Sequence, residues 1–170
     1  MSRLETSFKQ ASDCVLKSAV KIVDGDFSGA AEVRSLVERL QSEIATDVAS
    51  VLAAFALSLN KDLSENDELI AQRGSQLSIL GLILAHQLNF TLDDQQSTAM
   101  AGMFHDISLM ECVRFGRTKF NNSAYANHPI DSSWMLESAV GIDAKVGLAV
   151  SQLHEQVDGT GFPKRLPANR

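Results

Sequence analysis

The sequence predicts an all-α fold, a bundle of about six or seven helices, from three observations. The chain has only three prolines, all of them after residue 128, so the strongest helix breaker is absent from most of its length. Apolar residues recur at steps of three and four over long segments, which is the period of a helix face. No segment alternates apolar and polar residues as a half-buried strand does.

The first elements are helices separated by polar breaks. A short N-terminal helix is expected over residues 7–23, followed by Asp24-Gly25-Asp26, which favours a turn. The clearest helix spans residues 33–55, because its apolar residues fall on a single helical stripe. A polar interval over residues 60–67 precedes a strongly apolar helix that ends near Asn89.

The next helix has a recognisable start. Thr91 followed three residues later by Asp94 resembles a capping box, in which side-chain oxygens bind the free backbone N–H groups of the first turn. This helix is expected to reach His105. Residues 111–127 are polar, basic and aromatic by turns, and therefore predict a loop.

The last part of the chain predicts two more helices and a turn. The helices are expected over residues 128–140 and 143–156, with Trp134 and Leu136 in the core. The glycines and the proline of residues 158–163 then turn the chain.

Length and charge exclude several classes of function. The chain has 170 residues, 45% of them hydrophobic, which is enough for one compact core. Its formal net charge is -6, without a basic stripe, which argues against binding to duplex nucleic acid or to an anionic membrane surface. A small anionic ligand held by a few cations or a metal remains compatible with this charge.

Several features favour a soluble cytoplasmic protein. The most apolar stretches, residues 48–59 and 77–85, are well short of the roughly 20 residues that span a bilayer. The first residues lack the basic-then-apolar order of a signal peptide. Cys14 and Cys112 lie far apart and form no C-x-x-C pair, so neither a zinc knuckle nor a disulfide framework is indicated.

Three of the four histidines lie in contexts that suggest metal chemistry: His105-Asp106, His128-Pro129 and His154-Glu155. An imidazole and an adjacent carboxylate at a helix end can both reach one cation, because the last helical turn loosens. Each histidine alone is typical of a partly buried imidazole that binds the backbone. Helices that pack side by side would bring all three together. For the set we favour a metal site, the predicted metal set: His105, Asp106, His128 and His154.

These residues resemble the HD-GYP family of metal-dependent phosphohydrolases. In that family an H-D pair ends one helix, a histidine before a proline opens another, and an H-H-E-x-x-D-G-x-G-Y-P segment follows the next. Here residues 153–163 read LHEQVDGTGFP, which matches in order, with Phe162 in place of the tyrosine. The resemblance covers roughly residues 20–170.

The resemblance implies a fold, a substrate and a cofactor. It implies a helical bundle of HD-domain type, with an N-terminal helical segment at residues 1–60 and an HD-GYP-like domain at residues 61–170, incomplete at its C-terminus. In the family, iron or manganese ions activate a water that hydrolyses cyclic di-GMP. The resemblance therefore implies one or two iron or manganese ions held by the predicted metal set, with Asp106 as the catalytic residue.

Further residues are expected around this site. Three cations of the expected loop are predicted to contact substrate phosphate: Arg114, Arg117 and Lys119. Four residues of the last segment are predicted to orient ligands or to form the turn: Glu155, Asp158, Gly159 and Gly161. A solvated charged loop and an ordinary turn are the alternative interpretations. Phe162 cannot donate the hydrogen bond of a tyrosine, and is expected to serve packing alone.

The chain also departs from the family pattern at three positions. Arg73 lies where the family has an early metal-binding histidine, so a cation replaces a ligand. Leu153 replaces the first of two consecutive histidines, and Leu109 replaces a lysine that reaches the phosphate.

Three hypotheses follow from these matches and departures. The first is a metal-dependent phosphodiesterase that acts on a cyclic dinucleotide, cyclic di-GMP. The second is an inactive signalling module that binds a nucleotide or a protein partner without hydrolysis. The third is a plain helical interaction or dimerisation module in which the histidines are incidental. Self-association is also expected, because an early chain end would expose apolar helix faces.

Overall fold

The computed structural model describes residues 3–26, 28, 30–58, 67–114, 122–139 and 141–167, without the side chains of residues 3–9, 54, 57–58, 67, 111–114 and 122–124. The described residues form helices and, as their only β feature, an isolated bridge between Asp158 and Pro167. The all-α prediction is confirmed. The helices are α1 (Arg3–Val23), α2 (Ala30–Ser58), α3 (Asp67–Gln87), α4 (Leu92–Phe104), α5 (Ile107–Arg114), α6 (Asn122–Glu137) and α7 (Ala144–Gln152).

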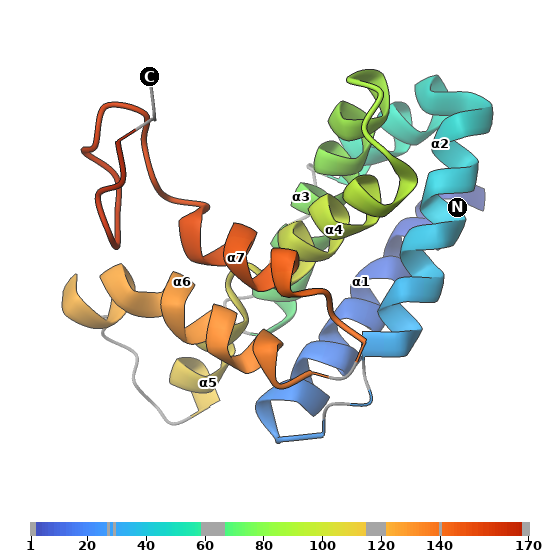
Figure 1. Cartoon of the computed structure of the whole chain (residues 1–170). Coiled ribbons are helices and arrows are strands. Elements are labelled where there is room, and N and C mark those ends of the chain that lie inside the picture. The colour runs from blue at the N-terminus through green and yellow to red at the C-terminus, as the bar shows by residue number, and fades with distance from the viewer. Residues whose placement is uncertain are drawn as a thin grey trace.

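The helices pack in pairs around a shared core. α1 lies along α2, and both contact α3, which pairs closely with α4 (Figure 1). α6 and α7 pair with each other, and α7 also contacts α4, while α6 contacts α5 and α1. One hydrophobic cluster includes residues from α1 through α7, and Phe104, Ile79 and Leu136 are among its fully buried side chains. Burial of each such side chain contributes about 1.5–3 kcal/mol to folding.

Glycines allow α3 and α4 to approach closely. A Cβ added to Gly102 of α4 would lie 2.8 Å from the backbone nitrogen of Ser78 and 2.9 Å from its Cα. A Cβ added to Gly74 of α3 would lie 3.1 Å from the carbonyl carbon of Met103. The two backbones are therefore in direct contact near the C-terminal end of α4.

The long helix expected over residues 33–55 is interrupted. Asp47 has non-helical backbone angles inside α2, φ -155° and ψ 78°. Its carboxylate accepts a hydrogen bond from the backbone nitrogen of Ser50 at 3.0 Å, as the side chain of an N-cap residue does. Asp47 therefore starts a new helical segment, and the apolar stripe continues across the kink without revealing it.

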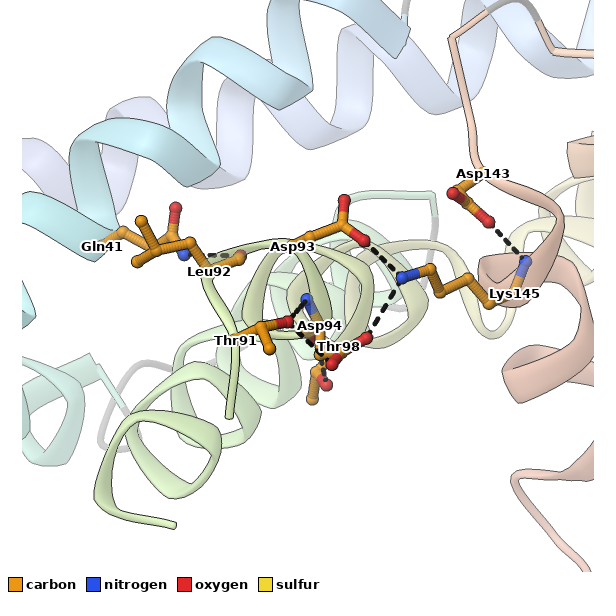
Figure 2. A network of polar contacts seen from close by, with 8 residues as sticks. All are labelled: Gln41, Thr91, Leu92, Asp93, Asp94, Thr98, Asp143 and Lys145. Carbon is orange, nitrogen blue, oxygen red and sulfur yellow. Dashed lines mark hydrogen bonds and ion pairs between the residues drawn. The ribbon is translucent and has the colours of Figure 1, made fainter. Parts of the chain in front are cut away.

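The start of α4 is capped as predicted and is tied to α7 (Figure 2). Thr91 Oγ1 accepts a hydrogen bond from the backbone nitrogen of Asp94 at 3.1 Å and donates one to its carboxylate at 2.7 Å. Lys145, in the first turn of α7, donates to Asp94 at 3.1 Å and also to Asp93. The backbone nitrogen of Lys145 is in turn capped by Asp143 at 2.9 Å. The two caps and the ion pairs hold the starts of α4 and α7 together.

Replacing Lys145 by methionine is expected to lower the Tm slightly, and the difference should vanish in about 1 M NaCl, because salt screens exposed ion pairs. Hydrogen bonds from Thr91 and Lys145 lower the pKa of Asp94. The stabilisation is therefore present at neutral pH and is lost as the pH falls through the carboxyl range. Thermal unfolding at low and high salt measures the effect, with Lys17→Met as the control. A deficit that persists at high salt would show that the methylene chain, and not the charge, matters.

Four details of the sequence prediction are wrong. The expected loop over residues 111–127 is helical at both ends, because α5 continues to Arg114 and α6 begins at Asn122. His128 consequently lies inside α6 and does not open it. α7 ends at Gln152, so His154 follows the helix. Trp134 is 63% exposed rather than part of the core. Apolar periodicity alone did not separate this exposed face of α6 from its buried one.

In the described ranges, no helix is long and apolar enough to cross a membrane.

Candidate metal centre

Three members of the predicted metal set meet at one point. Asp106 lies in the turn between α4 and α5, His128 lies within α6, and His154 follows the end of α7. One ligand atom from each lies within 4.8 Å of the other two. The site is thus assembled from three separate segments of the chain, which the packing of α4, α6 and α7 brings together.

A backbone carbonyl orients the imidazole of His128. Its Nδ1 lies 2.5 Å from the carbonyl oxygen of Tyr125. Because a carbonyl oxygen can only accept, Nδ1 carries the ring proton and donates it. The neutral ring then has a lone pair at Nε2, which lies 3.1 Å from Asp106 Oδ1 and 3.2 Å from His154 Nε2. Three electron-rich atoms therefore face one another.

This donor set fits a divalent transition metal. Two imidazole nitrogens and a carboxylate oxygen are the ligands that iron, manganese and zinc accept in proteins. Ligands about 2.1 Å from one ion and at right angles to each other lie about 3 Å apart, which is close to the separations around His128 Nε2. A metal-binding histidine usually donates its other ring N–H to a carbonyl or a carboxylate, as His128 does.

His105 lies beside this group and not within it. Its Nδ1 lies 2.8 Å from the carbonyl oxygen of Gly102, and its Nε2 lies 3.1 Å from Asp106 Oδ2. Asp106 therefore has His105 on one carboxylate oxygen and His128 on the other. The ligand role of His105 stays a prediction, and its observed contact orients Asp106.

The ionisation of these groups favours cation binding. Burial opposes the charge of Asp106, but the hydrogen bond from His105 and the close contact with His128 outweigh it and hold the pKa of Asp106 far below its usual range. Burial and the nearby His128 lower the pKa of His154, which favours the neutral ring that a metal requires. Burial opposes protonation of His105 as well, but Asp106 raises its pKa overall.

Aromatic rings and a tight turn fix His154. The ring of Phe162 stacks on the His154 imidazole, with centroids 4.6 Å apart and planes 9° apart. The backbone nitrogen of Phe162 donates a hydrogen bond to the carbonyl oxygen of His154 at 3.1 Å. A Cβ on Gly161 would lie 2.5 Å from that same oxygen, so glycine is needed for this close approach. The expectation that Phe162 packs without donating a side-chain hydrogen bond fits this contact.

The other predicted residues of the last segment form its turn. Glu155 accepts hydrogen bonds from the backbone nitrogens of Lys164 at 2.6 Å and Leu166 at 2.8 Å. Asp158 accepts from the backbone nitrogen of Thr160 at 2.9 Å, and Gly159 has a positive φ of 77°. These residues shape the loop that carries Phe162 back onto His154.

The predicted substrate contacts stay predictions. Arg117 and Lys119 lie outside the described residues, and so does the side chain of Arg114. Of the positions that depart from the HD-GYP pattern, Leu109 is 8% exposed and Leu153 is 38% exposed.

Sequence reasoning missed the residues that support the site. Tyr125 and Gly102 each offer a carbonyl to the histidine three residues later, a spacing that a helix provides and that the sequence could have suggested. Ser108 donates to the carbonyl of His128 at 3.0 Å, and Ser132 donates to Ser108 at 2.9 Å. This buried pair joins α5 to α6, and no local pattern in the sequence pointed to it.

Comparison with known proteins places the chain in a family. No curated protein and no solved structure matches the sequence. The family model described as HD domain matches residues 58–170, well over half of the chain, and its match covers Asp106, His128 and His154. HD domains are in general metal-dependent phosphohydrolases, which agrees with the donor set that meets here. The chain belongs to the HD domain family.

Proposed function

We propose that this protein binds a divalent transition metal, iron or manganese, at Asp106, His128 and His154 and hydrolyses a phosphodiester bond of a cyclic dinucleotide. The convergence of these three ligand atoms within 4.8 Å carries the proposal. The HD-GYP resemblance of residues 153–163 supports cyclic di-GMP as the substrate.

Each residue of the site would have a separate role in binding the ion or in orienting its ligands. A bound divalent cation would supply Lewis acidity, which lowers the pKa of a water molecule and offsets charge on phosphoryl oxygens. Asp106 supplies the negative charge that attracts the cation. His105, whose pKa is raised, holds a proton between its Nε2 and Asp106 Oδ2, and so turns Oδ1 toward His128. Phe162 covers one face of His154 and limits the rotation of its ring.

A hydrolysis assay tests this proposal. Protein reconstituted with Mn²⁺ or, without oxygen, with Fe²⁺ is incubated with cyclic di-GMP, and the products are separated by chromatography. We expect a linear dinucleotide or GMP from the parent protein. Asp106→Asn should reduce turnover by at least about 100-fold, because the site loses its anionic ligand. Metal-loaded parent protein without turnover would contradict the proposal.

A second candidate, the inactive signalling module, is favoured by one observation. Leu109 is buried at the position of the family lysine that reaches the phosphate, so that contact is missing. This candidate predicts that cyclic di-GMP binds in a calorimetric titration and is recovered unchanged. The two functions therefore differ in turnover and not in binding.

A further inference from the structure

Arg73 is a free cation on α3. Its side chain is exposed, and within the part of the chain that the structure describes it makes no hydrogen bond and no ion pair. Exposed arginines without a partner are common on protein surfaces. A function for Arg73 must therefore be argued from where it lies.

Arg73 lies on α3 where that helix packs against the end of α4, the helix that leads into Asp106. The next residue, Gly74, touches the backbone of Met103 so closely that an added Cβ would lie 3.1 Å from the carbonyl carbon and 3.4 Å from Cα. Met103 precedes His105 by two residues at the end of α4. α3 therefore brings residue 73 next to the end of α4 that leads into the site.

A free guanidinium at this place has a defined chemistry. Guanidinium binds phosphate oxygens through paired N–H groups and keeps its charge at every physiological pH. Two-metal phosphodiesterases stabilise the charge of the phosphoryl group with a second cation. The described ligand group offers three atoms, which suits one ion, and a nearby arginine disfavours a second ion by repulsion.

We propose that Arg73 binds a phosphate oxygen of the substrate beside a single metal ion, and so supplies the charge that a second ion provides in two-metal sites. The ligand class is a phosphate ester, recognised through its non-bridging oxygens. This inference rests on the proposed function, because the phosphate is placed next to the ion at Asp106, His128 and His154.

The test is the binding of inorganic phosphate to Mn²⁺-loaded protein by calorimetry, with metal content measured in parallel. Arg73→Gln should weaken phosphate binding by at least about tenfold, since hydrogen bonds to a charged group are lost. It should leave the manganese content at about one ion per chain. Arg73→Lys should retain part of the affinity. Arg39→Gln, which changes an exposed arginine of α2, is the matched control and should bind phosphate as the parent does.

The outcomes separate this inference from the proposed function. Equal phosphate affinity in Arg73→Gln and the parent overturns the role of Arg73, even when the metal centre is intact. Two manganese ions per chain in the parent overturn the claim that Arg73 replaces an ion. A parent that takes up no metal refutes the proposed function, and the same titration without metal then decides whether Arg73 binds phosphate. The absence of phosphate binding by the parent overturns the inference.

Discussion

Replacing His154 by alanine, or Asp106 by asparagine, is expected to weaken the binding of Mn²⁺ by at least about 100-fold, because changes to residues that merely orient ligands already cost about 10–100-fold. The site offers one ligand atom from each of Asp106, His128 and His154. Loss of one leaves two, so the protein replaces fewer of the water molecules around the ion and holds it less tightly. Elemental analysis of purified protein and a Mn²⁺ titration measure the effect.

Two further variants sharpen this experiment. His86→Ala removes a histidine of α3 outside the ligand group and should keep the full metal content. His105→Ala should have an intermediate effect, because His105 contacts Asp106 Oδ2 but is not within the group. Circular dichroism must show that each variant keeps its helices. Undiminished metal binding by folded His154→Ala would mean that the ion lies elsewhere.

Replacing Gly102 by alanine should lower the free energy of unfolding by about 3 kcal/mol, the upper part of the range for overpacking a core. The new methyl group would lie 2.8 Å from the backbone nitrogen of Ser78. Backbone atoms cannot rotate away as a side chain can, so α3 and α4 must separate. The gain in helix propensity, about 1 kcal/mol, offsets only part of this cost. Urea unfolding measures the difference.

Gly81→Ala is the matched control for this change. Gly81 lies in α3 and also faces α4, but its added Cβ would meet the methyl group of Thr98, a side-chain atom, at 3.2 Å. A side chain can shift by a few tenths of an ångström, so this variant should change stability by less than about 1 kcal/mol in either direction. Gly102→Ala should also weaken metal binding, because the carbonyl of Gly102 orients His105. Equal stability of both variants would show that the helices are not held at this contact.

Local signals in the sequence predicted much of the fold. The cap of α4 was visible because Thr91 and Asp94 are three residues apart, and the same spacing forms the cap in the structure. The kink at Asp47 was not visible, because apolar residues continue on one face and only the backbone angles change. The start of α6 was missed because its first turns are polar and aromatic, without an apolar stripe.

The sequence predicted which residues form the site, Asp106, His128 and His154, but not how their side chains are oriented. His128 and His154 are 26 residues apart, and sequence alone gave no direction for either ring. The structure supplies it through Tyr125, whose carbonyl fixes the tautomer of His128, and Phe162, whose ring stacks on His154. The stacking of Phe162 depends on tertiary packing, and the carbonyl of Tyr125 is a group that every residue has, so residue type reveals neither contact. Only the spacing of three residues between Tyr125 and His128 was available as a signal in the sequence.

The two hydrogen bonds that Glu155 accepts from the last loop constrain the amino acid at position 155 more than the amino acids at its partner positions. Both of its partners are backbone N–H groups, those of Lys164 and Leu166. Positions 164 and 166 can therefore accept any residue that retains this N–H, and they exclude only proline. Position 155 needs a carboxylate of the right length. We therefore expect positions 164 and 166 to tolerate many substitutions and position 155 to tolerate few.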